Sequence, residues 1–228
     1  MVYVLKGIEE KWIPRTEIKE MGDFLLRHPR HLYPLHNSIT QTRCVSHLRQ
    51  KLELAIGEAI SYGMIKRGDV TDQFATLSTR FIKLDLAKPG SARGALLEYL
   101  CYSRGPFRHR TDVGGISRLR KCTLQNQQGG TQCGDNNIDV GFVHASVGIL
   151  ELQECKYRLS NFLDGSSATG RKLDYMKCVQ QCISGGSFCA QVVFVSMQFD
   201  LRREKDVLKQ MGLDFVCFGF DDVLSLIA

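Results

Sequence analysis

The sequence predicts an α/β protein in which helices flank a mixed β-sheet, preceded by a small, mostly helical N-terminal region. A strand–turn–strand pattern spans residues 136–156, and helix and strand patterns then alternate as far as residue 227. The 228 residues suffice for one large domain or for one domain with an appendage. A Lys-Pro-Gly-Ser breaker cluster at residues 88–91 marks the boundary. We therefore expect an appendage at residues 1–90 and the core at residues 91–228.

The N-terminal region contains one clear amphipathic helix, which ends near Gly63. Prolines at positions 14, 29 and 34 interrupt the chain before this helix. No catalytic pattern occurs in the region, so dimerisation, covering of an active site and contact with nucleic acid all stay open as its role. The apolar residues of the helix recur at steps of three and four: Val45, Leu48, Leu52, Ala55 and Ala59.

The core alternates between helices and strands around the strand–turn–strand unit. Its first helix, over residues 94–100, carries Glu98. Glycines end the later helices, and the strands that follow them are apolar. Since alternating helices and strands cover both faces of a sheet, this order predicts the mixed, helix-flanked arrangement. The later elements are a helix at about residues 168–183, a strand at 190–196, a helix at about 201–211, a strand at 214–218 and a helix at 221–227.

Two carboxylates and one ammonium group converge at the end of the predicted hairpin. The first strand, at residues 136–143, contains Asp139, and the second, at residues 148–156, ends in Glu154 and Lys156. Centring the hairpin on its short, glycine-containing turn places Asp139 opposite Glu154. Lys156 lies two residues after Glu154, and side chains two apart in a strand share a face. The three charged groups are therefore expected to lie together.

These residue types suit metal-assisted hydrolysis of a phosphodiester. Mg²⁺ prefers carboxylate, carbonyl and water oxygens, so we assign Asp139 and Glu154 to a metal ion, with the backbone carbonyl of Cys155 as a third ligand. Such an ion lowers the pKa of bound water and polarises the phosphoryl group. Lys156 would orient that water or stabilise the charge of the transition state. Glu98, on the preceding helix, is the candidate for a further catalytic acid.

A purely structural explanation exists for each of these residues. Asp139 would then be a solvated acid at a strand edge, and Glu154 with Lys156 would form the exposed face of a half-buried strand. The second strand, however, is rich in leucine and isoleucine, as expected of a central strand, and this favours a functional site for a charged pair at its end. Glu151 points to the opposite face from Glu154, and we expect it to be structural or to contact a neighbouring helix.

Asp139 followed by the Glu-Cys-Lys tripeptide at residues 154–156 resembles the PD-(D/E)XK nuclease superfamily, with Asn-Ile-Asp in place of the leading Pro-Asp. The helix of Glu98 resembles the first core helix of that superfamily. The match covers roughly residues 91–228. It extends through a Lys-Leu-Asp-Tyr-Met helix, a Gly-Gly pair and the apolar run at 190–196, a pattern similar to the nuclease domains of CRISPR-ancillary effectors that carry a cyclic-oligonucleotide sensor.

The resemblance implies a three-layer, restriction-endonuclease-like core and a metal-dependent endonuclease that cuts DNA, with RNA as an alternative substrate. It further implies Mg²⁺ or Mn²⁺ as the cofactor, a homodimer that cuts both strands, and defence against phage or plasmids. The 90 residues before the core are too few for the sensor domain, so we expect any such control to come from a separate sensor subunit. Two alternatives remain: a restriction or DNA-repair nuclease whose N-terminal region sets specificity, and a catalytically idle nucleic-acid-binding module.

The net charge is +6, and basic residues flank the acidic hairpin in the sequence. Both features favour a polyanionic partner, because lysine and arginine bind phosphates. A solvated charged face is the structural alternative. No stacking platform for single-stranded bases is evident, and Trp12 is the only tryptophan. The candidate nucleic-acid contacts are Arg104, Arg108, Arg110, Arg118, Arg120, Lys121, Arg158, Arg171 and Lys172.

Nine cysteines raise the question of disulfides and zinc. No apolar run approaches a membrane span, and the apolar stretch near the N-terminus is too short for a signal peptide, so we expect a cytoplasmic protein. That setting argues against structural disulfides. The spacings lack the paired short steps of usual zinc sites. The candidate ligands would be Cys178 and Cys182, one helical turn apart, with Cys189, and with Cys122 and Cys133 as further candidates.

Overall fold

The computed structural model of the chain describes residues 3–8, 14–108, 115–126, 133–134, 136–165, 167–184 and 189–228. The chain forms two compact units. The first comprises Met1–Lys11 and Cys101–Val223, and the second comprises Trp12–Leu100 and Leu224–Ala228. The first unit holds the sheet, and the second consists of helices.

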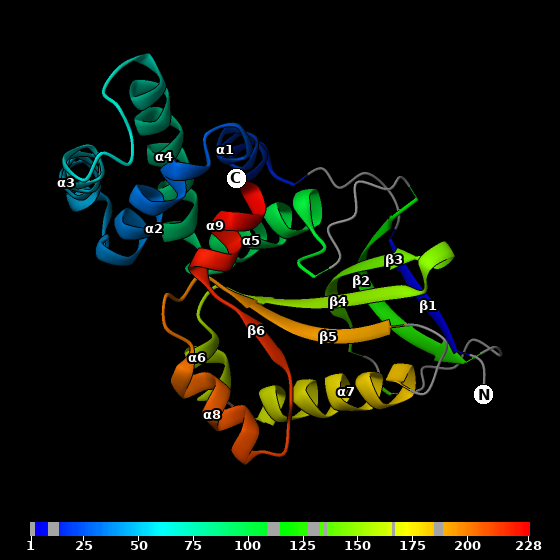
Figure 1. The fold of residues 1–228 in the computed structure, drawn as a ribbon. Coiled ribbons are helices and arrows are strands. Elements are labelled where there is room, and N and C mark those ends of the chain that lie inside the picture. The colour runs from blue at the N-terminus through cyan, green and yellow to red at the C-terminus, as the bar shows by residue number, and fades with distance from the viewer. Residues whose placement is uncertain are drawn as a thin grey trace. The chain divides into compact units, whose positions relative to one another are not determined.

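The first unit is built on one six-stranded mixed sheet in which the strands lie side by side in the order of the chain (Figure 1). The first four strands pair with one another in antiparallel orientation. β5 is parallel to β4, and β6 is parallel to β5, because a helix returns the chain before each of them. The strands are β1 (Tyr3–Ile8), β2 (Ser117–Asn126), β3 (Ile138–His144), β4 (Ile149–Lys156), β5 (Cys189–Ser196) and β6 (Val216–Phe218).

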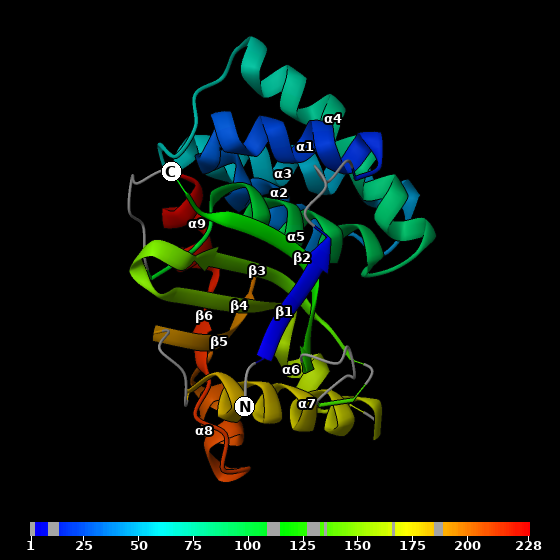
Figure 2. The ribbon, with the colours of Figure 1, turned by 90° about the vertical axis from the view of Figure 1, so that its right-hand side faces the viewer.

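Three helices of the first unit cover one face of this sheet: α6 (Leu159–Leu163), α7 (Ser167–Ser184) and α8 (Arg202–Gln210) (Figures 1 and 2). The core between them and the sheet combines apolar side chains from both layers, for example Leu152 and Phe194 from the strands with Met176 from α7, all fully buried. Burying one such side chain contributes about 1.5–3 kcal/mol, so this layer holds α7 firmly against the strands.

The opposite face is covered by the end of α5 (Ser91–Arg104) and the segment that follows it. A Cβ on Gly105 would lie 2.4 Å from the ring of Phe142 on β3, so only glycine allows this approach. The ring of Phe107 stacks on that of Phe218 in β6, with centroids 4.4 Å apart. Helices thus flank the mixed sheet in a three-layer α/β arrangement, and the predicted fold class is confirmed.

The second unit packs α1 (Thr16–Arg27), α2 (Leu32–Gln41), α3 (Leu48–Ser61) and α4 (Asp69–Ala87) together with most of α5. Phe24 of α1 and Phe74 of α4 stack at its centre, with centroids 5.7 Å apart. Gly22 of α1 lies directly against the ring of Tyr99 on α5, where a Cβ would clash at 2.3 Å. The Tyr99 hydroxyl donates a 2.5 Å hydrogen bond to Asp23, so α5 is fixed to α1 by both packing and polar contacts. The short 3-10 helices are Pro29–His31, Val45–His47 and, in the first unit, Ala145–Val147.

The division of the chain differs from the predicted one in two respects. Residues 3–8 form β1, which pairs with β2 in the sheet rather than belonging to the helical region. Most of α5 belongs to the helical unit, so the boundary falls near residue 100 instead of residue 90.

The amphipathic helix expected to end near Gly63 is α3, which ends at Ser61. Last comes α9 (Phe220–Ile227). Across the described ranges, every helix is too short or too polar to cross a membrane.

Candidate functional site

The candidate site lies at the end of the β3–β4 hairpin, whose register is the predicted one. Val140 pairs with Gln153, and one further step along this register places Asp139 across from Glu154. The turn is closed by Gly148, which adopts the left-handed conformation with a φ of +66° that favours glycine. The backbone N–H of Cys155 donates a 2.9 Å hydrogen bond to Oδ2 of Asp139, which fixes the aspartate against the second strand.

One ammonium group bridges the two carboxylates. Nζ of Lys156 donates to Oε1 of Glu154 at 2.5 Å and lies 3.5 Å from Oδ2 of Asp139. Glu154 is completely buried, whereas the side chains of Lys156 and Asp139 remain 26% and 18% exposed. The two acids are therefore close enough to share a single cation, as the sequence predicts, and the site is open to solvent at Lys156 and Asp139.

The ionisation of the site follows from this burial and from the neighbouring charges. Burial raises the pKa of Glu154, and the negative charge of Asp139 raises it further, although Lys156 and Lys172 oppose both effects. Burial lowers the pKa of Lys156, but the carboxylates of Glu154 and Asp139 outweigh it and the net change is upward. Lys156 is therefore a protonated cation at neutral pH, which suits it to binding negative charge and not to acting as a base.

A second lysine, Lys172 on α7, completes the charge balance of Glu154. Its Nζ lies 2.9 Å from Oε2 of Glu154, not aligned for a hydrogen bond, and it donates to the backbone carbonyl of Asn137. The side chain is only 14% exposed. The sequence predicts a nucleic-acid contact for Lys172, whereas in the structure this lysine lies in the site as a partner of Glu154. The position of a lysine in a helical sequence does not reveal this role, because the role depends on how α7 packs against the sheet.

Lys156 is held by one more contact, with an aromatic ring. Its Nζ lies 5.2 Å from the centroid of Phe162 on α6, within the range of a cation–π interaction. Phe162 follows the tripeptide closely in the sequence but gave no signal, because a phenylalanine after a strand is usually a core residue. Sequence analysis therefore missed two neighbours of the site, Lys172 as a charge partner and Phe162 as a support.

The donor set fits a hard divalent cation. The three oxygens that the sequence assigns to a metal all surround Nζ of Lys156: Oε1 of Glu154 at 2.5 Å, the carbonyl of Cys155 at 3.4 Å and Oδ2 of Asp139 at 3.5 Å. These are two carboxylates and a carbonyl, the ligands that Mg²⁺ and Mn²⁺ prefer. No other histidine, cysteine or acid among the described residues completes a group of three with these two acids. Water and a phosphate oxygen would fill the remaining positions.

Glu151 lies on the opposite face of β4, as expected, and is structural. Its carboxylate accepts hydrogen bonds from the backbone N–H groups of Phe107 at 2.9 Å and Arg108 at 3.1 Å. The side-chain amide of Gln153 donates a third, at 2.6 Å. The expected helix contact is thus a contact to the segment just after α5.

The remaining predicted residues are spread over several elements. Glu98 is half-buried on α5, in the part of that helix that belongs to the second unit, and its catalytic role stays a prediction. Arg110 lies outside the described residues. Arg120 is half-buried on β2. The other candidate nucleic-acid contacts are exposed, and their role also stays a prediction: Arg104, Arg108, Arg118, Lys121, Arg158 and Arg171.

Comparisons with known proteins do not assign the chain to a family. No family model matches it, and no curated protein is similar to it. Among solved structures, the crystal structure of protein VC1899 from Vibrio cholerae aligns with a TM-score of 0.40 and 13% identity. The alignment covers 98% of this chain and 57% of that one, so the chain spans little more than half the length of its structural neighbour.

Proposed function

We propose that the protein is a divalent-metal-dependent endonuclease that hydrolyses phosphodiester bonds in DNA, with RNA as an alternative substrate. The observation that carries the proposal is the arrangement of Asp139, Glu154 and the Cys155 carbonyl around one cationic atom. A basic protein that pairs a buried glutamate with a partly exposed aspartate and also carries exposed arginines has charges suited to binding and cutting a polyanion. Mg²⁺ or Mn²⁺ is the cofactor that fits these oxygens.

The residues of the site divide the work by charge. Asp139, Glu154 and the Cys155 carbonyl would hold the metal ion, which supplies an acidified water and a polarised phosphoryl group when bound. Lys156 keeps its proton, so its ammonium group stabilises the negative charge that grows on the phosphate and orients the water by hydrogen bonding. Lys172 offsets the charge of Glu154 and holds its carboxylate in place through the ion pair on Oε2.

The wider role is proposed on the sequence resemblance alone. Resemblance to the PD-(D/E)XK nucleases of CRISPR-ancillary effectors favours a homodimer that acts on phage or plasmid DNA in the cytoplasm. The exposed arginines and the exposed Lys121 would bind the phosphate backbone without reading sequence. A sensor subunit would then supply control.

One observation favours a second candidate function. Nζ of Lys156 lies among the three oxygens that would coordinate a metal ion. A lysine that stays there in the presence of Mg²⁺ would leave the site idle, and the protein would bind nucleic acid without cutting it.

A cleavage assay separates the two functions. Supercoiled plasmid, linear duplex, single-stranded DNA and RNA are incubated with the protein and Mg²⁺, Mn²⁺, Ca²⁺ or EDTA. The nuclease proposal expects cleavage with Mg²⁺ or Mn²⁺ that EDTA abolishes. Asp139→Asn and Lys156→Gln should lose it, whereas Asp174→Asn, at an exposed acid on α7, should keep it. Binding that weakens with salt, without cleavage under any divalent ion, would overturn the nuclease proposal and favour the binding module.

A further inference from the structure

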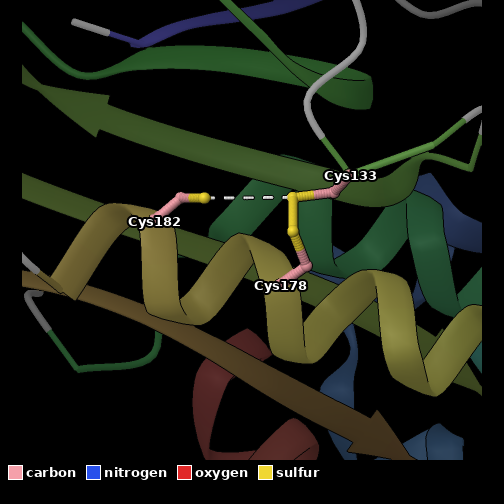
Figure 3. A group of neighbouring side chains, drawn as sticks. All are labelled: Cys133, Cys178 and Cys182. Atoms are coloured by element: carbon pink, nitrogen blue, oxygen red, sulfur yellow. Dashed lines mark hydrogen bonds between the residues drawn. A yellow bond between two sulfur atoms is a disulfide. The ribbon is translucent and has the colours of Figure 1, made fainter. Parts of the chain in front are cut away.

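Three cysteine sulfurs gather on one side of α7. Within the described parts of the chain, Cys133, Cys178 and Cys182 form a group whose sulfur atoms lie within 4.8 Å of one another (Figure 3). Cys133 and Cys178 are joined as a disulfide, and the thiol of Cys182 lies 4.0 Å from the sulfur of Cys133. All three side chains are half-buried, so the cluster is open to small solutes.

The cluster is held by two separate parts of the first unit. Cys178 and Cys182 are one helical turn apart and therefore project from the same face of α7. Cys133 comes from the chain before β3, and its Cα lies 5.7 Å from that of Cys178. Helix α7 is fixed against the sheet by the apolar core described above, so two of the three sulfurs stand on a rigid element.

Two buried cysteines of the first unit have different surroundings. Burial raises the pKa of the Cys122 thiol to about 12, with a smaller effect from Asp139, and burial raises that of Cys217 to about 11. Thiols in such surroundings stay protonated and act as small hydrophobic side chains. The cluster on α7 is half-exposed instead, so solutes can reach its sulfurs.

We propose that Cys133, Cys178 and Cys182 form, when reduced, a binding site for a thiophilic divalent cation such as Zn²⁺, with a solvent molecule as the fourth ligand. Zinc–sulfur bonds of about 2.3 Å in a tetrahedron place sulfurs roughly 3.8 Å apart. The 4.0 Å between Cys133 and Cys182 already has this spacing, and Cys178 needs only to separate from Cys133. A disulfide would account for two neighbouring cysteines, but it gives no reason for the third sulfur.

The disulfide must open before the ion can bind. A dithiol reductant breaks the sulfur–sulfur bond, donates two electrons and two protons to Cys133 and Cys178, and becomes a disulfide itself. Binding of the ion then releases the protons of the coordinating thiols, so affinity should rise with pH. The bound ion would tie the chain before Asp139 to the helix that carries Lys172. This inference stands apart from the proposed nuclease activity.

Cobalt is the probe for the test, because Co²⁺ occupies zinc sites and reports its ligands in its absorption spectrum. The full chain is reduced, stripped with chelator under nitrogen and titrated with Co²⁺. We expect one bound ion per chain, a thiolate-to-cobalt charge-transfer band, the visible bands of a tetrahedral ion, and loss of all of them when Zn²⁺ is added. A titration without the charge-transfer band overturns the proposal.

The decisive variant is Cys182→Ser, because Cys182 is outside the disulfide. If the cluster is only a disulfide pair, this substitution changes nothing. If the cluster binds metal, the substitution weakens Zn²⁺ binding by more than about 100-fold. Losing a ligand should cost more than the 10- to 100-fold cost of losing a residue that orients a ligand. Cys44→Ser, at an exposed cysteine of the second unit, is the matched control and should bind like the wild type.

Alkylation of the unmutated protein tests the same site without relying on the folding of a variant. Iodoacetamide is applied to reduced protein with and without Zn²⁺, and each cysteine is followed by mass spectrometry. The proposal expects zinc to protect Cys133, Cys178 and Cys182 by at least about 10-fold in rate while Cys44 stays reactive. Equal labelling of the three cysteines with and without zinc overturns it.

Discussion

Glu151 and Glu154 lie on the same strand, β4, and both are almost completely buried, yet their surroundings are opposite. Glu151 accepts hydrogen bonds from two backbone N–H groups and one amide, and all of these donors are neutral. Glu154 lies beside a second carboxylate and is paired with two ammonium groups. The first arrangement ties a segment to the sheet. The second concentrates charge at one point, next to a solvent-facing aspartate.

The difference teaches how a functional acid can be told from a structural one. The carboxylate of a structural acid accepts hydrogen bonds from donors that fix its geometry. Replacing those donors with a metal ion or a substrate would therefore gain no free energy. Glu154 is instead buried beside the carboxylate of Asp139. Burial raises its pKa, the like charge of Asp139 raises it further, and both make a cation a favourable neighbour. Such opposed charges at a solvent-facing point are typical of sites that bind metal or substrate.

The largest difference between the two acids is expected in the cleavage rate when the charge of each is removed. Glu154→Gln should lower the rate of metal-dependent plasmid cleavage by about 10²–10⁴-fold, because it removes a metal ligand and the partner of Lys156. Glu151→Gln should keep the activity per folded molecule within a few-fold of wild type. Cleavage rates measured on protein of matched folded fraction check this. Equal losses in the two variants would contradict the distinction.

Removing the carboxyl group altogether should separate the two roles in stability. Glu151→Leu should lower the free energy of unfolding by about 3–5 kcal/mol, because two backbone N–H groups and one amide are left buried without an acceptor. Glu154→Leu should cost less. Lys156 keeps Asp139 and Lys172 keeps the Asn137 carbonyl, and the change removes both the repulsion with Asp139 and the burial of a charge. Urea unfolding of both variants provides the comparison, and a larger loss for Glu154→Leu would argue against it.

Proton binding sharpens the comparison further. The raised pKa of Glu154 means that the native protein holds this proton to higher pH than the unfolded chain does. Its contribution to stability therefore falls as pH rises from the ordinary glutamate range through the raised value. Lys172→Gln removes a cation that lowers this pKa, so the acid limb of the cleavage profile should move to higher pH.

The matched control is Lys177→Gln, at an exposed lysine of the same helix, which should leave the acid limb where it is in the wild type. A profile measured between pH 4 and 9 shows the difference. An acid limb that moves to lower pH in Lys172→Gln would contradict the role given to this lysine.

The smallest effects are expected on the exposed basic residues. Arg118→Ala and Arg158→Ala should each weaken DNA binding uniformly across sequences and reduce the salt slope by about one. Equilibrium binding to unrelated duplexes at several salt concentrations measures this. An unchanged slope in both variants would place the DNA on a different surface.

Much of the hairpin and the C-terminal half was predictable because local signals define them. Apolar strands, a turn glycine and helix-ending glycines sufficed to place β3, β4 and α7, and the pairing of Asp139 with Glu154 followed from the period of a strand. The face of Glu151 followed from the same period. These features depend on residues that are close in sequence.

The features that sequence analysis missed depend on distant partners. β2 has the polar sequence Ser-Arg-Leu-Arg-Lys-Cys-Thr-Leu-Gln-Asn, which lacks a strand pattern and gains its structure by pairing with β1 and β3. Lys172 reaches Glu154 only because α7 packs against the sheet beside β5. The pairing of Cys133 with Cys178 joins residues 45 apart and overturns the expectation of no disulfide. Long-range packing decides all three.

The most direct test of the central claim is a titration with Mn²⁺ followed by the electron paramagnetic resonance signal of the free ion. Mn²⁺ prefers oxygen ligands, so the carboxylate site should bind it in preference to the cysteines. We predict that wild type and Glu151→Gln bind the ion with similar affinity, and that Asp139→Asn and Glu154→Gln lose this binding. Equal binding by all four proteins, or no binding by the wild type, would contradict a shared metal site at Asp139 and Glu154.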